Sequence, residues 1–456
     1  MPVSVLLTST SRRLRTIMNG ARALIAVCQL TSTHDMEYNF EIAKSMMKRA
    51  KERNAQMIFF PECFDFVGRN REENESQAVT EDGDYIGRYR QCAKQYGLWL
   101  SLGGFHEKNS NEARKPFNTH IIVDDQGVTR GLYRKLHLFD IDIPGKVRLI
   151  ESEFSSPGNE IPKPICTPVG NIAMSICYDL RFAELALWNR MNGTHILTYP
   201  AAFTVSTGMS HWETLLRARA IETQCYVVAA AQTGKHNDKR SSYGHTMVVD
   251  PWGAVIAQCS EAVDMCFAEI SPNYLDEIRK LQPVFDHRRS DLYSLVMLQK
   301  NEIGNDDYVF GDHKIPSEHV FYRTSHTFCF VNRKPVLQGH VLICPIRYVK
   351  RLTELSNVET ADLFITSKKI QAVLESYYKT TSSTICVQDG SAAGQTVSHV
   401  HVHLLPRTKG DLGDDPDNVY HRLAEHDKTD DQKFRDRREM QDEANLYRSL
   451  LLIKQE

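Results

Sequence analysis

A cysteine at the end of an apolar run is the first residue of this chain that is placed to do chemistry. Cys177 follows the apolar residues 172–176 and precedes a polar turn, residues 178–181, and a helical pattern over residues 182–193. A thiol where a strand changes to a helix lies near backbone N–H groups without helical partners, and the positive end of the helix lowers its pKa. This is a typical setting for a nucleophilic cysteine. The alternative is a small buried apolar residue, because the chain contains eleven cysteines.

Three charged residues lie at comparable positions, at or beside the ends of other apolar runs. Glu62 follows the run 56–60, Lys135 ends the apolar segment within residues 131–138, and Glu151 lies between two loops, 140–145 and 155–158. Catalytic groups in α/β folds gather at strand ends. One carboxylate can accept the thiol proton, the ammonium can stabilise an oxyanion, and the second carboxylate can keep the ammonium charged. The alternative roles are a helix-cap neighbour, a solvated charge and a surface loop residue.

Three histidines alternate with valines in residues 398–406, SHVHVHLLP. In a strand, His399, His401 and His403 project from one face, because side chains alternate with a period of two. A neutral imidazole is a good nucleophile toward phosphorus, and its neighbours can donate hydrogen bonds to phosphate oxygens. The small residues of the loop 390–394 let a backbone approach an anion closely. Metal binding is the alternative, although three residues on one straight strand do not converge readily on a tetrahedral ion.

The elements that must position the first set of residues follow an α/β pattern. Strand-like runs cover residues 23–30, 56–60, 98–107 and 118–123, and helical patterns cover residues 38–54 and 86–96. Further on, the runs 194–203 and 225–232 flank a helix over residues 212–223, and residues 244–258 form a hairpin around 250–253. These strands are almost entirely apolar, so we expect sheets that are covered on both faces.

A polar stretch at residues 299–307 indicates a linker, so we place a domain boundary near residue 303. The predicted domains are then residues 23–302 and 303–456, after an N-terminal extension of residues 1–22. The second domain has strand-like runs at 328–331, 340–344 and 384–387 and a helical pattern over residues 353–378. Its charged end, residues 427–456, carries Leu446, Leu450 and Ile453, which indicate either a helix docked by an apolar stripe or a frayed, solvated helix.

Composition excludes several classes of function. A formal charge of −2 gives no reason to expect binding to a nucleic acid polymer or to a membrane surface, and no apolar run is long enough to span a bilayer. The cysteines form no C-x-x-C pair, which fits a reducing compartment. The first 34 residues lack Asp and Glu and contain four arginines, as a mitochondrial transit segment does. We favour the other interpretation, an irregular start to a cytoplasmic enzyme.

The segments FFPECF, GLYRKLHLF, SICYDLRF and LLRARAIETQCYVVAAAQTG occur in an order and spacing that resemble the nitrilase/carbon–nitrogen hydrolase superfamily, in its Nit branch. The resemblance covers about residues 23–293. It implies an αββα sandwich with Glu62, Lys135 and Cys177 as the catalytic set and Glu151 as an additional glutamate.

The same resemblance implies a mechanism. The thiolate of Cys177 attacks an amide carbonyl, Lys135 and the N–H of Tyr178 hold the oxyanion, and Glu62 passes a proton to departing ammonia. Water then hydrolyses the thioester. The expected substrate is a small ω-amide such as deaminated glutathione, in preference to a nitrile.

The segments FCFVNRKPVLQGHVLICP, QDGSAAGQTVSHVHVHLLPR and VYHRLAEHDK resemble the Fhit branch of the histidine-triad (HIT) superfamily over about residues 308–426. The resemblance implies an α+β domain that splits diadenosine triphosphate into AMP and ADP, with His401 as the nucleophile of a nucleotidyl–histidine intermediate. It implies no metal held by the protein, with Mg²⁺ or Mn²⁺ accompanying the phosphates. The residues implied in substrate binding are His313, Asn332, His340, Gln395, His399 and His403, and Tyr420 matches a family tyrosine that is associated with signalling.

Together the two resemblances predict a nitrilase-like domain fused to a Fhit-like HIT domain. The first hypothesis for function is a bifunctional hydrolase, with bis(5'-adenosyl)-triphosphatase and amidase activities. The alternative is a tumour-suppressor-type signalling protein, in which the dinucleotide-bound HIT domain is the signal, hydrolysis ends it, and the Nit half is a scaffold. If both halves self-associate, a closed homotetramer is the expected assembly.

Overall fold

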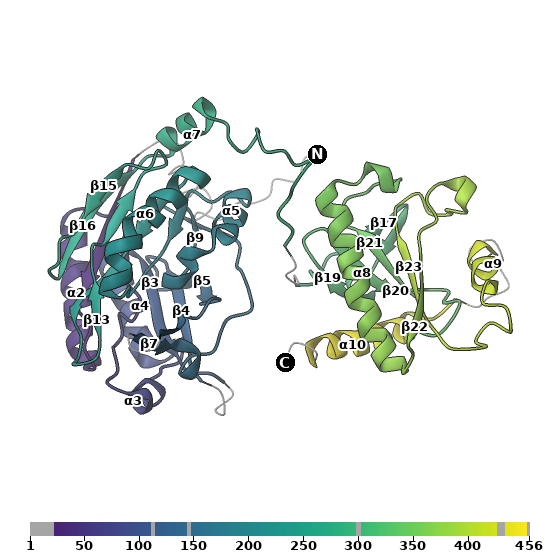
Figure 1. The fold of residues 1–456 in the computed structure, drawn as a ribbon, viewed down its shortest axis with the longest axis horizontal. Helices are drawn as coiled ribbons and strands as arrows, with labels where there is room; N and C mark the ends of the chain where they lie inside the picture. The colour runs from purple at the N-terminus through teal and green to yellow at the C-terminus, as the bar shows by residue number, and fades with distance from the viewer. Residues whose placement is uncertain (1–21, 111–114, 144–146, 298–301, 426–433, 454–456) are drawn as a thin grey trace, which may run out of the picture. The chain divides into compact units, whose positions relative to one another are not determined.

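The computed structural model describes residues 22–110, 115–143, 147–297, 302–425 and 434–453 (Figure 1). The chain divides into two compact units after Arg288, and each unit is described by itself. The predicted boundary near residue 303 therefore falls inside the second unit. Apart from Arg22, the predicted N-terminal extension lies outside the described residues, as does part of the predicted linker. No helix in the described ranges is both long and apolar enough to cross a bilayer.

The first unit contains two large β-sheets. The eight-stranded sheet has the order β13-β12-β1-β2-β3-β4-β5, with β16 paired to β1, and the six-stranded sheet has the order β15-β14-β11-β10-β9-β8. The larger sheet consists of β1 (Ala23–Leu30), β2 (Met57–Phe60), β3 (Trp99–Glu107), β4 (Phe117–Val123), β5 (Thr129–Arg134), β12 (Ala231–Lys235), β13 (Ser241–Tyr243) and β16 (Asp264–Ile270). The smaller sheet consists of β8 (Ile165–Thr167), β9 (Gly170–Ala173), β10 (Ile196–Thr198), β11 (Tyr226–Ala229), β14 (Met247–Val249) and β15 (Val255–Gln258).

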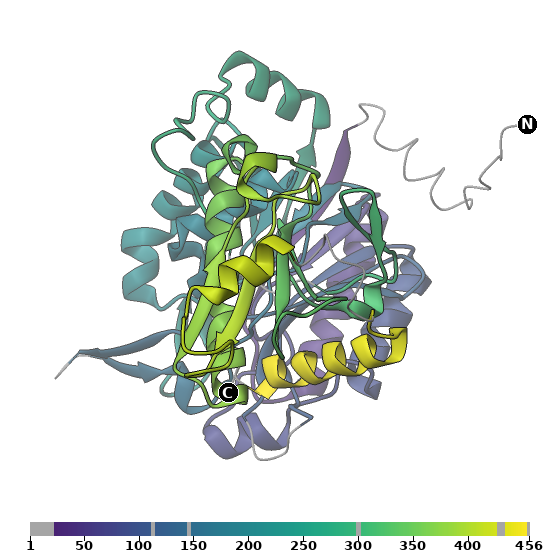
Figure 2. The ribbon, with the colours of Figure 1, turned by 90° about the vertical axis from the view of Figure 1, so that its right-hand side faces the viewer.

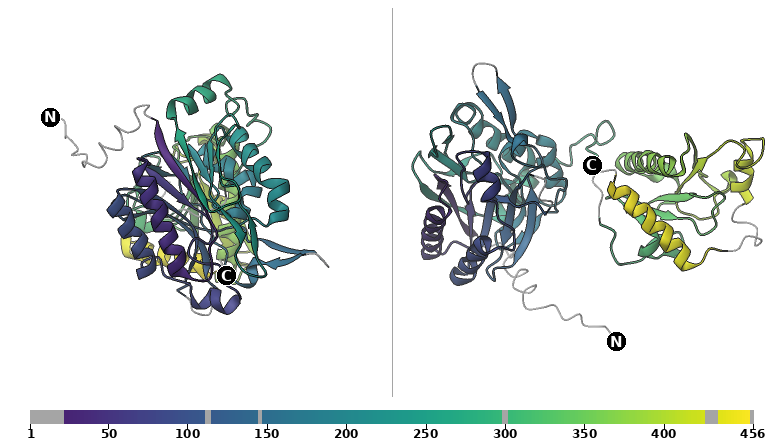
Figure 3. Two further views of the ribbon diagram at one scale, coloured as in Figure 1. Left: turned by 90° about the vertical axis from the view of Figure 1, so that its left-hand side faces the viewer. Right: turned by 90° about the horizontal axis from the view of Figure 1, so that it is seen from below.

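Helices cover the outer face of each sheet. The helices α2 (Met36–Glu52) and α4 (Asp84–Tyr96) pack on the larger sheet, and α5 (Ala183–Met191) and α6 (Val205–Thr223) pack on the smaller one (Figure 3, left). The carboxylate of Asp35 caps α2 by accepting the N–H groups of Glu37 and Tyr38, and Gly97 ends α4 with a φ of 60°. The predicted αββα sandwich is confirmed.

The strand β1 shows why the larger sheet is buried on both faces. Ile25 and Val27 belong to the core that contains residues of the smaller sheet, such as Val227, whereas Ala26 packs in the core that contains Phe40 of α2. Because side chains alternate across a strand, an all-apolar strand must be covered on both sides. The prediction made from the apolar runs is therefore confirmed.

The segment after β5 differs from the prediction. Part of the stretch 140–145, expected to form a loop, is the strand β6 (Asp140–Ile143), which forms an antiparallel ribbon with β7 (Val147–Ile150), and residues 144 and 145 lie outside the described residues. The alternation of the sequence DIDI is a strand pattern, and it prevails over the turn residues Pro144 and Gly145 that follow. The ribbon leads directly into a 3₁₀ turn, Glu151–Glu153, so Glu151 is held by ordered backbone instead of a loose loop. The short helices α3 (Arg71–Ser76) and α7 (Pro272–Leu281) complete the described helices of this unit.

The second unit has a five-stranded antiparallel sheet with the order β19-β20-β21-β23-β22. Its strands are β19 (Val320–Arg323), β20 (Thr327–Val331), β21 (Val341–Pro345), β22 (Ser382–Cys386) and β23 (Val402–Arg407), and a hairpin of β17 (Tyr308–Phe310) and β18 (His313–Ile315) precedes them. The helices α8 (Asn357–Tyr378) and α10 (Arg437–Ile453) share the core on one face of the sheet, and α9 (Asn418–Glu425) lies between them in the chain. The predicted α+β domain is confirmed.

The C-terminal helix α10 is docked beside β19 and β20 (Figure 2). Its buried side chains are Met440, Ala444, Tyr447 and Leu451, and the Tyr447 hydroxyl is hydrogen-bonded to Tyr378 and Glu443, at 2.7 Å each. The docked alternative is thus correct, and the frayed helix is wrong. The buried stripe is displaced by one position from the predicted leucines Leu446 and Leu450, which are half-buried at its edge, and the side chain of Ile453 lies outside the described residues.

We expect Tyr447→Ala to destabilise the second unit by about 3–5 kcal/mol, because the change leaves a cavity in the core and removes two hydrogen bonds. Urea unfolding of the full chain measures the loss. Asp442→Ala, an exposed change on the same helix, should stay within about 0.5 kcal/mol of wild type. Equal effects of the two changes would contradict the docking.

Candidate active sites

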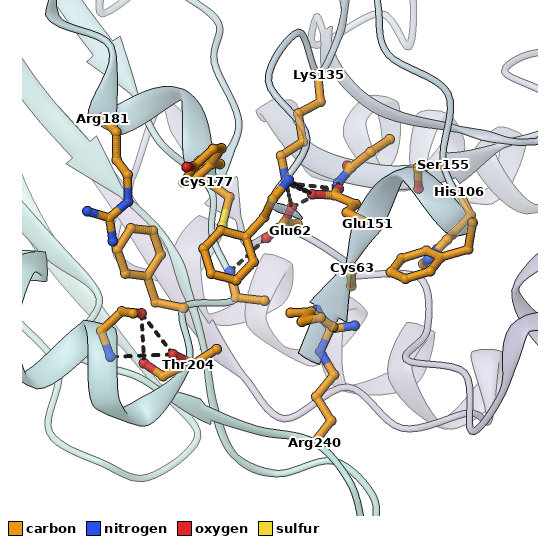
Figure 4. A pocket seen from close by; sticks show the side chains of 18 residues that line it. Glu62, Cys63, His106, Lys135, Glu151, Ser155, Cys177, Arg181, Thr204 and Arg240 are labelled. Atoms are coloured by element: carbon orange, nitrogen blue, oxygen red, sulfur yellow. Dashed lines mark hydrogen bonds and ion pairs between the residues drawn. The ribbon is translucent and has the colours of Figure 1, made fainter. Parts of the chain in front are cut away.

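The four residues predicted to act together, Glu62, Lys135, Glu151 and Cys177, line one pocket of the first unit (Figure 4). Glu62 lies two residues after β2, Lys135 directly follows β5, and Glu151 directly follows β7. Cys177 begins a 3₁₀ turn, Cys177–Arg181, that follows the smaller sheet. Strand ends from both sheets therefore meet at one site.

The backbone turn at Cys177 is held by a buried carboxylate. Cys177 has a φ of 47°, in the left-handed region that L-residues other than Gly, Asn and Asp rarely adopt. Asp179 accepts hydrogen bonds from the hydroxyl of Tyr133 at 2.6 Å, the ring Nδ1 of His137 at 2.7 Å and the backbone N–H of Ile176 at 2.8 Å. These bonds fix the turn and aim the sulfur into the pocket.

The ammonium of Lys135 lies between two carboxylates. Its Nζ is 2.9 Å from Oε1 of Glu62 and 2.8 Å from Oε2 of Glu151, and all three side chains are buried. The N–H of Phe139 also donates to Glu151, at 2.8 Å. Burial opposes the charge on Lys135, but Glu151 and Glu62 outweigh it and raise the pKa of the ammonium well above its ordinary value. The lysine is therefore a fixed cation.

The thiol of Cys177 does not have the low pKa that was expected from a helix end. Burial and then the charge of Glu62 raise the pKa of Cys177 well above its ordinary value, and Lys135 only partly opposes this. The expected helix dipole is missing because Cys177 begins a short 3₁₀ turn and α5 starts only at Ala183. The prediction of a stable thiolate is wrong for the free protein.

Glu62 is placed to accept the thiol proton. Burial favours its neutral form, but the charge of Lys135 and the hydrogen bond with Cys177 lower the pKa of the carboxyl below its ordinary value. Its other oxygen, Oε2, accepts the backbone N–H of Ala202 at 2.8 Å. At neutral pH the pair is thus a carboxylate beside a protonated thiol, which is the starting state for general-base catalysis.

Two pocket residues were missed in the sequence. Asn118 of β4 donates from Nδ2 to Oε1 of Glu62 at 2.8 Å and to Oε1 of Glu151 at 3.4 Å, so it helps to hold both carboxylates. A polar amide in an otherwise apolar strand could have indicated it. Arg240, directly before β13, also lines the pocket, and no local pattern points to it. Tyr178, which was predicted, lines the pocket as well.

In the second unit, His313, Asn332, His401 and His403 line a second pocket. The strand predicted over residues 398–406 is shorter, because β23 begins at Val402 and only His403 of the three histidines lies in it. The alternation nevertheless holds over residues 400–403, which include the two residues before the strand. Val400 and Val402 enter the core, and the rings of His401 and His403 lie 4.8 Å apart on the pocket side.

Hydrogen bonds define the tautomer of His401. Its Nδ1 lies 2.7 Å from the carbonyl oxygen of His399, which can only accept, so Nδ1 carries the proton. In the neutral ring this leaves the lone pair on Nε2. In this tautomer, Nε2 of His401 can act as a nucleophile.

A second chain of hydrogen bonds orients His403. The N–H of Val336 donates to Nδ1 of His340 at 3.1 Å, so Nε2 of His340 carries the proton and donates to Nδ1 of His403 at 3.0 Å. In neutral His403 the proton then lies on Nε2, as a hydrogen-bond donor. His340 is fully buried and therefore acts through His403.

His399 supports the site from outside the pocket lining. Its Nδ1 accepts the N–H of Gly311 and its Nε2 donates to the carbonyl of Arg347, both at 3.2 Å, and burial lowers the pKa of the ring. With both nitrogens engaged, the ring has no lone pair for a shared metal ion. In the described ranges, no cluster of three or more His, Cys, Asp or Glu side chains is arranged to hold a metal.

Two further predicted residues of the second unit lie apart from the pocket lining. Gln395 is bonded to backbone, donating to Lys350 at 3.0 Å and accepting from Gly390 at 2.8 Å. Tyr420 is exposed on α9. Their predicted roles stay predictions.

Comparisons with known proteins agree with this geometry. The carbon-nitrogen hydrolase family model matches residues 24–280, and the HIT domain model matches residues 314–410. The chain is 58% identical over 438 residues to the nitrilase and fragile histidine triad fusion protein NitFhit of Caenorhabditis elegans, covering 96% of this chain and 98% of that protein. The crystal structure of C. elegans NitFhit matches with a TM-score of 0.85 and 55% identity, covering 94% of this chain and 99% of that chain. The first unit is also similar to the deaminated glutathione amidase of Bos taurus, with 51% identity over 272 residues, covering 59% of this chain and 83% of that protein.

The fold and the two pockets define a nitrilase-class hydrolase domain joined to a histidine-triad domain. The chain belongs to the carbon-nitrogen hydrolase family and carries a HIT domain in the same polypeptide, as the NitFhit fusion proteins do. The fusion expected from the two resemblances is confirmed. Both families indicate hydrolase activity, with an amide and a nucleotide as the substrate classes.

We expect Glu62→Gln to slow amide hydrolysis by about 10²–10⁴-fold, because the general base is lost. The same change removes a negative charge that raises the pKa of Cys177, so iodoacetamide should alkylate this thiol at a lower pH than in wild type. Peptide mass spectrometry over a pH series measures the alkylated fraction of Cys177 in both proteins, with the exposed Cys166 as an internal control. Alkylation that moves to higher pH would contradict the assignment.

Proposed function

We propose that the first unit hydrolyses a small ω-amide through a thioester on Cys177, with deaminated glutathione as the leading substrate. The observation that supports this most strongly is the buried contact of Lys135 with both Glu62 and Glu151 beside the thiol. The 51% identity to a deaminated glutathione amidase supports the choice of substrate.

The proposed reaction has two halves. Glu62 takes the proton of Cys177 as the sulfur adds to the amide carbon, and the oxygen gains charge that Lys135 and the N–H of Tyr178 stabilise. The tetrahedral adduct collapses to a thioester as Glu62 returns the proton to the departing nitrogen. Glu62 next activates a water molecule, which attacks the thioester and releases the carboxylic acid and the thiol. Glu151 acts by holding Lys135 in place.

We propose that the second unit splits diadenosine triphosphate into AMP and ADP. Nε2 of His401 attacks the α-phosphorus, a phosphoanhydride bond breaks, and ADP leaves as a nucleotidyl–histidine forms. Water then attacks the phosphorus, which releases AMP and regenerates the imidazole. Support comes from the tautomers, because His401 presents a lone pair and His403 a donor toward the same pocket. In this proposal, neither reaction needs a cofactor held by the protein, and Mg²⁺ or Mn²⁺ accompanies the phosphates of the dinucleotide. We also propose that the protein acts as a homotetramer in the cytoplasm.

The two activities should be separable by single changes. We expect Cys177→Ala to abolish amide hydrolysis and leave dinucleotide hydrolysis intact, and His401→Asn to do the reverse, since the nucleophiles lie in different units. Mass spectrometry of products from deaminated glutathione and diadenosine triphosphate measures both. Loss of both activities in either folded variant would contradict two independent nucleophiles.

We expect His340→Leu to lower kcat for the dinucleotide by about 100-fold with little change in KM, because the donor that fixes the tautomer of His403 is lost. Steady-state kinetics separates the two constants, and circular dichroism checks the fold. His313→Ala, an exposed pocket residue, should raise KM instead. A rise in KM alone for His340→Leu would assign it to substrate binding.

A further inference from the structure

Arg240 extends into the cysteine pocket, and its side chain has no partner among the residues that the structure describes. Figure 4 shows Lys135 and Arg240 reaching toward the pocket from opposite sides. The guanidinium of Arg240 makes no ion pair or hydrogen bond with any residue in the described ranges, although its charge acts through space on Glu62 and Glu151. A half-buried guanidinium presents five N–H donors, which usually have acceptors in a folded protein.

The backbone around Arg240 is firmly held. Its N–H donates to Oδ1 of Asn237 at 3.0 Å, and its carbonyl accepts the N–H of His236 at 2.9 Å. The ring of His236 is fixed by the carbonyl of Ser32 at 2.9 Å and the hydroxyl of Ser242 at 2.8 Å. Burial lowers the pKa of His236 to about 4, so this ring adds no charge beside the arginine at neutral pH. The turn between β12 and β13 therefore presents Arg240 as a positioned cation.

The charges that line the pocket favour an anion. Glu62 and Glu151 carry two negative charges beside the single positive charge of Lys135, so these three residues together have one excess negative charge. Arg181 and Arg240 change the sum over these five residues to one excess positive charge. Arg181 is already engaged, because its Nη2 lies 3.2 Å from Nδ1 of His211 and its guanidinium lies near the ring of Phe203. Within the described residues, Arg240 is thus the pocket arginine whose guanidinium has no hydrogen-bond partner.

We infer that Arg240 binds a carboxylate of the substrate at the end remote from the scissile amide. This rests on the proposed amidase function and assigns the residue that binds the carboxylate of its substrate. A planar guanidinium matches a carboxylate with two parallel hydrogen bonds, and a partly desolvated site strengthens both. The remote charge is bound equally in the ground state and the transition state, so its effect falls on KM.

The test compares succinamate with butyramide, a neutral amide of the same chain length. In the wild-type protein, kcat/KM for succinamate should exceed that for butyramide by at least about 10-fold. In Arg240→Met this ratio should fall by about 10- to 100-fold through KM, and Arg240→Lys should restore part of it. Lys239→Met removes an exposed cation from the same turn and should keep the wild-type ratio.

Binding to the Cys177→Ala protein separates this inference from the proposed function. Calorimetry should show that a further Arg240→Met change weakens succinamate binding by about 10- to 100-fold. An Arg240-dependent affinity without hydrolysis by the wild-type protein would retain the inference and reject the amidase function. If the wild-type protein hydrolyses the amides but Arg240→Met leaves the kcat/KM ratio of succinamate to butyramide unchanged, the amidase function is retained and the inference is rejected. A wild-type protein that does not distinguish the two amides overturns the inference whether or not the variants fold.

Discussion

The buried contact of Lys135 with two carboxylates is the interaction on which the larger active site depends. The ammonium is 2% exposed, so it can stay charged only because Glu62 and Glu151 lie within 2.9 Å of it. Removing one partner from such a buried cluster costs about 3–5 kcal/mol, since a charge is left without compensation. The cluster therefore links the ends of β2, β5 and β7, and it also brings the three charged groups that follow these strands into one site. The charge of Lys135 helps to keep Glu62 ionised. Burial and the charge of Glu62 then keep the proton on Cys177.

The two units prepare their nucleophiles in different ways. In the first unit, burial and charge decide the proton position, because the buried thiol lies beside the negative charge of Glu62 and keeps its proton. In the second unit, neutral hydrogen bonds decide it, because the carbonyl of His399 and the N–H of Val336 select the tautomers of His401 and His403. Charged groups act over a distance, whereas tautomers need exact contacts. The site of the second unit therefore depends more on packing, including that of Val400 and Val402, which hold the histidine segment against the core.

Much of this architecture could be predicted from local patterns. Apolar runs predicted β1 with the bounds that it has in the structure, and strand ends marked Glu62, Lys135 and Cys177 as candidates that the structure brings to one pocket, because both signals depend on neighbouring residues. The position of Arg240 could not be predicted, since it depends on the parallel pairing of β12 with β1, in which Ala231 pairs with Gln29. The direction of the thiol pKa was mispredicted for the same reason. It depends on how completely other segments bury the sulfur, which a strand-to-helix pattern does not contain.

The left-handed backbone at Cys177 has a consequence for which side chains the position can accept. A residue with a branched Cβ, such as threonine, would clash with its own backbone at a φ of 47°, so the nucleophile must be unbranched. Cys63, which lines the same pocket, has a φ of 57°. Such conformations cost of order 1–3 kcal/mol each for residues other than glycine. Glycine would adopt both conformations without this cost, so the thiol proposed as the nucleophile lies at a position whose backbone favours glycine.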